Sequence, residues 1–185
     1  MKPSPELRKS VRHFPRHPES WGFLADLYQK ASRTDDAIEA KRHQLDGEGR
    51  IGPGEFLTAA SWLKARGKPG DVTAAIAILD RAMARFGLLT GLQQSAIELE
   101  CSVGRHEAAL KRIDDLVVKY QPSPALSLQR ADIFEATGRY DDAARACDSA
   151  LAMLPADPSV TALRQTIQTR KTTNQEKAAP TPAPR

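Results

Sequence analysis

Three pairs of adjacent aspartates are the residues that first suggest chemistry, because two neighbouring carboxylates can act as general acid and base. The pairs lie at 35–36, 114–115 and 141–142. The first and last stand where helices are expected to begin, and acidic side chains there cap free amides and oppose the positive end of the helix dipole. We therefore interpret all three pairs as structural.

The sequence lacks the residue spacing that other catalytic, metal-binding or phosphate-binding sites require. The two cysteines, Cys101 and Cys147, are 46 residues apart with no C-x-x-C pair, so neither a disulfide framework nor a zinc site is expected. The glycine-rich stretch 47–54 lacks the lysine and hydroxyl residue of a phosphate-binding loop. The histidines share no metal-ligand spacing, and no serine nucleophile stands near a plausible base. These residues are His13, His17, His43, His106, Ser95 and Ser102. We predict a non-enzyme with no cofactor and no metal.

An internal repeat is the dominant pattern of the chain. The octet at 21–28 places Trp21, Leu24, Ala25 and Tyr28 on one helical face, and its phase recurs downstream. The recurring phase is marked by four alanines spaced 38, 34 and 34 residues apart, namely Ala37, Ala75, Ala109 and Ala143. Four inserted residues around 68–70 explain the longer interval. Such a period indicates stacked helical hairpins.

The period divides the chain into a solenoid at 1–170 and a tail. We expect hairpin units at about 18–51, 52–89, 90–123 and 124–157, and a polar capping helix at 158–170. Residues 171–185 are rich in Pro, Ala and Thr and lack apolar side chains, so we expect disorder there.

An incomplete unit precedes the first complete one. Leu7, Val11 and Phe14 have the spacing of a second helix whose first helix is absent, giving a half-unit at 5–15. Either this half-unit is a natural cap or the chain has been shortened at its start. Because no segment has the length of a signal peptide or a membrane span, the chain as written is expected to be soluble and cytoplasmic. A shortened chain leaves a periplasmic or secreted location open.

The W-x-x-L-A-x-x-Y octet, with a small residue at the turn and alanine in the second helix, resembles the tetratricopeptide repeat over roughly residues 5–157. The resemblance implies an all-α, right-handed α-α superhelix of about four units, with the half-unit and the capping helix at its ends. Lys41 and Gln44 depart from the family pattern, so we expect the first unit's second helix to pack loosely. The residues expected to pack between helices are Trp21, Leu24, Ala25, Tyr28, Ala37, Ala59, Trp62, Ala75, Ala109, Ala131, Phe134 and Ala143.

The resemblance also implies a concave groove, built mainly from the first helix of each hairpin, that holds a peptide or a partner's helix. The polar residues phased toward it are Asp26, Gln29, Lys30, Lys64, Gln94, Glu98, Asp132 and Glu135. Because acids outnumber lysines, the expected partner is a neutral or basic protein segment, although a merely solvated face is the alternative. Gly22 and Asp26 stand where a carboxylate-binding clamp would begin, which argues against that clamp.

Two further interactions remain open as alternatives. Residues 1–17 and 164–185 each carry a net charge of +4 against −4 for the body between them, so the ends could bind nucleic acid or an anionic surface. The half-unit at 5–15 could instead dock a second copy of the chain.

Overall fold

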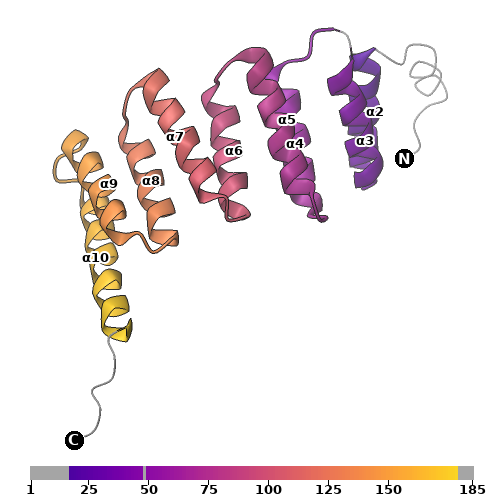
Figure 1. Cartoon of the computed structure of the whole chain (residues 1–185). Coiled ribbons are helices and arrows are strands. Elements are labelled where there is room, and N and C mark those ends of the chain that lie inside the picture. The colour runs from indigo at the N-terminus through magenta and orange to yellow at the C-terminus, as the bar shows by residue number, and fades with distance from the viewer. Residues whose placement is uncertain (1–16, 48, 179–185) are drawn as a thin grey trace, which may run out of the picture. The chain divides into compact units, whose positions relative to one another are not determined.

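The computed structural model describes residues 17–47 and 49–178, with side chains as far as residue 173. Every regular element in these ranges is an α-helix, which confirms the all-α, helical-repeat fold class (Figure 1). The half-unit at 5–15 lies outside the described residues. The helices are α2 (Pro18–Lys30), α3 (Thr34–Asp46), α4 (Pro53–Arg66), α5 (Asp71–Phe86), α6 (Thr90–Ser102), α7 (His106–Tyr120), α8 (Pro124–Ala136), α9 (Tyr140–Met153) and α10 (Pro158–Ala178).

The chain divides into two compact units. The N-terminal unit comprises residues 1–103 and the C-terminal unit residues 104–185. The division falls between α6 and α7, inside the repeat expected at 90–123. Each unit is therefore described by itself.

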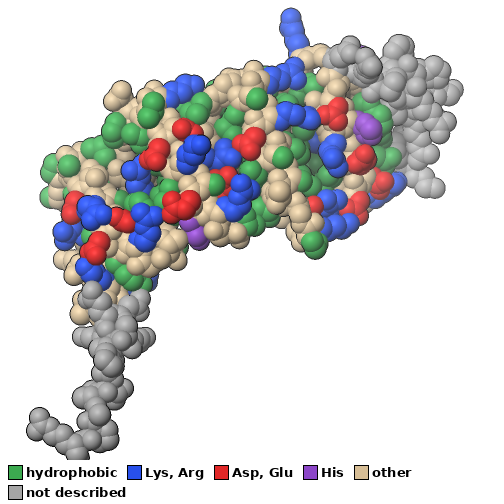
Figure 2. Space-filling model, viewed as in Figure 1, with side chains coloured by type: hydrophobic (Ala, Val, Ile, Leu, Met, Phe, Trp, Pro, Cys, Tyr) green, Lys and Arg blue, Asp and Glu red, His purple; other side chains and the backbone are tan. Residues whose placement is uncertain are grey.

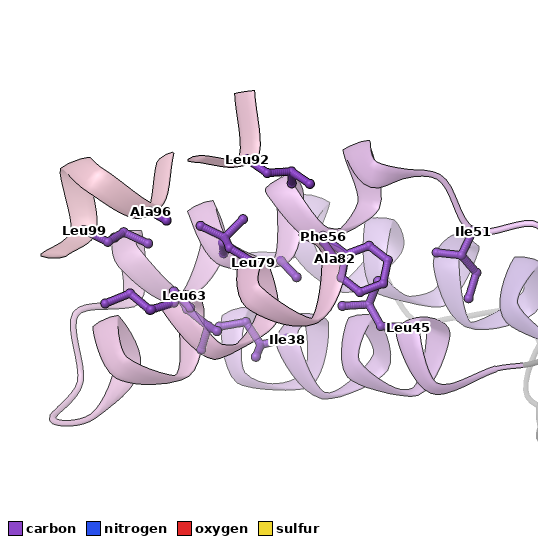
Figure 3. Close-up of a cluster of buried hydrophobic side chains, with 14 residues drawn as sticks. Ile38, Leu45, Ile51, Phe56, Leu63, Leu79, Ala82, Leu92, Ala96 and Leu99 are labelled. Carbon is purple, nitrogen blue, oxygen red and sulfur yellow. The ribbon is translucent and has the colours of Figure 1, made fainter. Parts of the chain in front are cut away.

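The N-terminal unit has a core formed by α3, α4, α5 and α6 (Figure 3). Phe56 is 1% exposed at its centre and meets the ring of Phe86 edge-on, with centroids 5.7 Å apart. Ile51 belongs to the same core although it lies in the glycine-rich connection after α3. That connection is therefore anchored by a buried side chain.

The C-terminal unit has its own core, to which the last helix contributes. Val160 and Ile167 of α10 bury themselves against α8 and α9. Farther along, Arg170 pairs with Glu135 and Lys171 with Asp141. The prediction of a disordered tail from residue 171 is wrong for 171–178, which are helical, and residues 179–185 lie outside the described part.

Small residues lie at the closest contacts between helices, where little side-chain volume lets backbones approach. Four aromatic residues from the predicted packing set, Trp21, Tyr28, Trp62 and Phe134, are half-buried. The remaining members are buried, none more than 4% exposed: Leu24, Ala25, Ala37, Ala59, Ala75, Ala109, Ala131 and Ala143.

The starts of the second helices are stabilised by arginine rather than by the expected capping carboxylates. At α3 the residue before the helix is Arg33, and Asp36 accepts a hydrogen bond from its Nε at 2.8 Å instead of capping an amide. The Arg33 guanidinium also lies 4.5 Å from the centroid of the Tyr28 ring. At α9, Arg139 repeats this corner with Asp142 and Phe134.

Arg66, at the end of α4, connects three helices of the N-terminal unit. It donates two hydrogen bonds to Asp71 at the start of α5 and one, of 2.8 Å, to Asp35 at the start of α3. Asp71, expected as a possible cap, instead accepts from the backbone N–H of Lys68 and from Arg66, and its side chain is 5% exposed. The inserted residues are therefore fixed by a buried ion pair.

We predict that Ser32→Gly stabilises the N-terminal unit. Ser32 has φ +57°, whereas the corresponding corner of the fourth hairpin uses Gly138 at φ +73°. Relief of the left-handed strain should outweigh the added chain entropy and raise the free energy of unfolding by roughly 0.5–1 kcal/mol. Urea unfolding measures the change, and Gly138→Ser should shift stability in the opposite direction. A lower midpoint for Ser32→Gly would contradict the assignment of strain.

Candidate functional site

A hollow of about 400 Å³ lies in the N-terminal unit and is lined by residues of α2, α3 and α4. Its lining combines three carboxylates, one ammonium, a carboxamide and an exposed aromatic ring. The lining residues are Glu19, Gly22, Phe23, Asp26, Lys41, Gln44, Glu55 and Thr58.

Lys41 is the cation of the hollow, and its charge is already matched. The side chain is 3% exposed, and Nζ donates to Oε2 of Glu55 at 2.8 Å. The same ammonium lies 5.0 Å from the centroid of the Trp62 ring. Both partners belong to α4, so one buried charge on α3 holds the second hairpin against the first.

Gln44 lies one helical turn beyond Lys41 (i+3) and faces Gly22 of α2. A Cβ at Gly22 would come within 2.7 Å of Gln44 Nε2, so the carboxamide would have to shift if residue 22 carried a side chain. Gln44 is 8% exposed, and its Oε1 is buried without a hydrogen-bond donor among the described residues. The expectation that α3 packs loosely at these two polar residues is therefore wrong, because both are buried.

One stripe of α2 forms the outer wall. Glu19, Phe23 and Asp26 follow one another at i, i+4 and i+7, so they share a face over a length of about 10 Å. The ring of Phe23 is 68% exposed. Neither Glu19 nor Asp26 forms an ion pair with a described residue.

The residues predicted for the groove fall into different environments in the N-terminal unit. Asp26 lines the hollow, whereas Gln29 and Lys30 are exposed on α2 outside it. Lys64 of α4 and Glu98 of α6 come within 3.9 Å and form an exposed ion pair, and Gln94 is half-buried on α6. Sequence reasoning missed Glu19, Phe23 and Glu55, although the i, i+4, i+7 spacing on α2 could have revealed the first two.

Asp132 and Glu135 belong to α8 of the C-terminal unit. Glu135 is only 15% exposed because Arg170 of α10 binds it, so it serves to attach the last helix. Desolvation, and then the neighbouring charge of Glu135, raise the pKa of Asp132 above its usual value.

The described basic side chains of the C-terminal segment are paired within their own unit. Arg164 pairs with Asp148, and Arg170 and Lys171 pair with Glu135 and Asp141. On the face drawn in Figure 2, acidic and basic side chains are intermixed rather than gathered by sign. The basic residues at 1–16 lie outside the described part of the chain, so these observations favour no anionic partner.

The described part of the chain contains potential metal ligands and two thiols. No group of three or more His, Cys, Asp or Glu side chains there is arranged to hold a metal ion. Cys101 and Cys147 are free thiols, and burial raises the pKa of each. Among the same residues, no helix has the length and apolar character needed to cross a bilayer.

Comparison with known proteins agrees with the helical hairpins. The family model described as tetratricopeptide repeat matches residues 102–158. This part of the chain is therefore similar to tetratricopeptide repeats. The described helical hairpins share the fold of tetratricopeptide repeats, a fold that suggests a scaffold for protein–protein interaction.

Solved structures share the fold at low sequence identity. A thermophilic tetratricopeptide repeat protein of Thermus thermophilus is 17% identical, with 88% of this chain and 87% of that chain covered and a TM-score of 0.56. YrrB, described as having an unusual peptide-binding site, is 12% identical over 86% and 80% of the chains, with a TM-score of 0.62. MamA from Desulfovibrio magneticus is 10% identical over 87% and 89%, with a TM-score of 0.61. No curated protein sequence matches significantly.

We predict an asymmetry between the two partners of the buried ion pair. Glu55→Ala leaves the buried Lys41 ammonium without its carboxylate and should lower the free energy of unfolding by about 1–3 kcal/mol. Lys41→Met removes the buried charge while keeping an unbranched apolar side chain, and should cost less. Urea unfolding of both variants tests this, and an equal or larger loss for Lys41→Met would refute it.

Asp132→Asn should stabilise the C-terminal unit slightly at neutral pH, because the side chain of Asp132 is exposed and water screens its charge. Because the folded-state pKa of Asp132 is raised, the folded protein disfavours the charged form, and stability falls as pH rises through that pKa. The variant's higher denaturation midpoint at pH 7 should shrink as pH is lowered toward about 4, the ordinary aspartate value. Exposed Asp115→Asn of α7 is the matched control and should change little at either pH. A pH-independent gain for Asp132→Asn would argue against this cause.

Proposed function

We propose that the chain is a non-catalytic scaffold and that the hollow between α2 and α4 receives an extended peptide or a helix of a partner protein. The observation that carries this proposal is the buried Gln44 Oε1 without a donor, beside an exposed aromatic ring. A partner segment supplies hydrogen-bond donors for the carboxamide and apolar surface for the ring.

The composition of the hollow resembles that of a protein interface more than that of a small-molecule site. Phe23 offers a rigid aromatic anchor, and charged residues surround it, as in interfaces with an apolar centre and a polar rim. YrrB, which shares the fold, is described as having a peptide-binding site, which supports a peptide ligand here.

The electrostatics of the hollow favour a neutral or basic segment. Three carboxylates, from Glu19, Asp26 and Glu55, face the single ammonium of Lys41. An acidic segment would therefore meet like charges at close range, which disfavours it by repulsion and by incomplete desolvation. Lys64 and Glu98 neutralise one another nearby and leave this balance unchanged.

Selection of a displayed random peptide library on the full chain tests the proposal. We expect the enriched peptides to be neutral or basic and to lose about ten-fold in affinity on Phe23→Ala or Asp26→Lys, since both residues are exposed and line the hollow. Asp115→Lys, an equal change of charge on exposed α7, is the control and should bind normally. Enrichment of acidic peptides, or binding insensitive to both hollow variants, would reject the proposal.

Self-association through the half-unit at 5–15 is a distinct outcome of the same experiments. Sedimentation of the full chain and of a Val11→Asp variant separates the two. A concentration-dependent dimer that this variant abolishes, combined with no peptide selection, would make assembly the better function.

A further inference from the structure

We infer that the hollow between α2 and α4 is a subsite for an arginine side chain of the bound segment. This inference rests on the proposed function and specifies the chemistry that the site recognises. It is drawn from an unsatisfied acceptor, an imbalance of charge and an exposed ring that line the same space.

The unsatisfied acceptor is Gln44 Oε1. It is buried, the residue is 8% exposed, and no described residue donates to it. Both carboxamide atoms lie close to Gly22, with Nε2 at 2.7 Å and Oε1 at 3.3 Å from the position that a Cβ would occupy there, and Oε1 is the atom without a partner. A buried acceptor without a donor is costly, and the side chain of Gln44 lines the hollow, so a ligand whose N–H group reaches this oxygen from the hollow removes the cost.

The charge of the hollow calls for a cation. Lys41 is matched by Glu55 at 2.8 Å and covered by the ring of Trp62, so its positive charge is already compensated. Glu19 and Asp26 remain without an ion pair to any described residue, on the wall facing the same space. A cationic ligand restores the balance, whereas an anionic one increases the repulsion.

The ring of Phe23 distinguishes arginine from lysine. It is 68% exposed and stands between the two unpaired carboxylates along α2. A planar guanidinium can stack on an aromatic face while its forked N–H groups reach a carboxylate and an amide oxygen together. A lysine ammonium is more strongly hydrated and lacks the fixed fork. The hollow of about 400 Å³ has room for such a side chain.

A titration of the isotopically labelled full chain, followed by NMR, tests the subsite. The probe is Nα-acetyl-arginine methylamide, compared with the lysine analogue and with the neutral, nearly isosteric citrulline analogue. We expect saturable shifts of the Gln44 side-chain amide and of Phe23 in the millimolar range, at least about ten-fold weaker with citrulline. Unsaturated shifts, or equal affinity for citrulline, overturn the subsite.

Two variants separate recognition from structure. Gln44→Met removes the unsatisfied carboxamide at similar length, so stability should not fall while arginine affinity drops about ten-fold. Asp26→Asn, on the exposed wall, should also weaken arginine binding, and Asp115→Asn should not. Unchanged arginine affinity in both Gln44→Met and Asp26→Asn overturns the inference, whatever the stability of Gln44→Met.

The peptides from the library selection distinguish this inference from the proposed function. Peptides that bind through Phe23 but tolerate replacement of every arginine by citrulline overturn the subsite and leave the scaffold function intact. Saturable binding of the arginine probe at Gln44, with no peptide retained by the hollow, supports the subsite and rejects the peptide-binding function.

Discussion

A buried lysine ammonium determines how the first two hairpins meet. Lys41 is 3% exposed, and a charge so far from water is tolerated only when its partners are close and well placed. Those partners, the Glu55 carboxylate and the Trp62 ring, both lie on α4. An aromatic residue at this position, as in the family pattern, would make a non-directional apolar contact, which tolerates small shifts between the two helices. The ion pair is directional, so α4 must present these two side chains to α3, and the space between α2 and α4 follows from that requirement.

The same polar substitutions that disturb the repeat pattern create the candidate site. Gln44 takes the place of a small residue, and the chain accommodates it through Gly22, whose missing side chain leaves room for the carboxamide. The result is a buried acceptor without a donor among the described residues, beside carboxylates that the core does not need. Packing alone would be better served by an apolar side chain at residue 44, which is why we connect its unmet hydrogen bond with recognition rather than with stability.

The helices could be predicted because they depend on local periodicity, while the site could not because it depends on pairing across helices. The phase of Trp21 and the alanines is enough to place the hairpins and to single out Asp26, which lines the hollow. The caps were mispredicted because Arg33 and Arg139 compete for the aspartates. The length of α10 depends on carboxylates of α8 and α9 that bind Arg170 and Lys171. A lysine is rarely buried, so the burial of Lys41 was not predicted from the sequence. Phe23 was not predicted as a site residue because it is an aromatic residue on an otherwise polar helix face.

The arginine corner is not repeated in every hairpin. In the first and fourth hairpins an aromatic ring, Tyr28 or Phe134, and an aspartate three residues after the arginine hold the turn. The second hairpin replaces this corner with the Arg66–Asp71 pair across its insertion. In the third hairpin Arg105 is retained, but Glu100 and Ala108 stand where the ring and the aspartate would be. The boundary between the two compact units falls at this corner, between residues 103 and 104. The third corner therefore departs from the repeated pattern at both positions, so the phase of the repeat is kept there while the side chains that contact the arginine in the first and fourth hairpins are not.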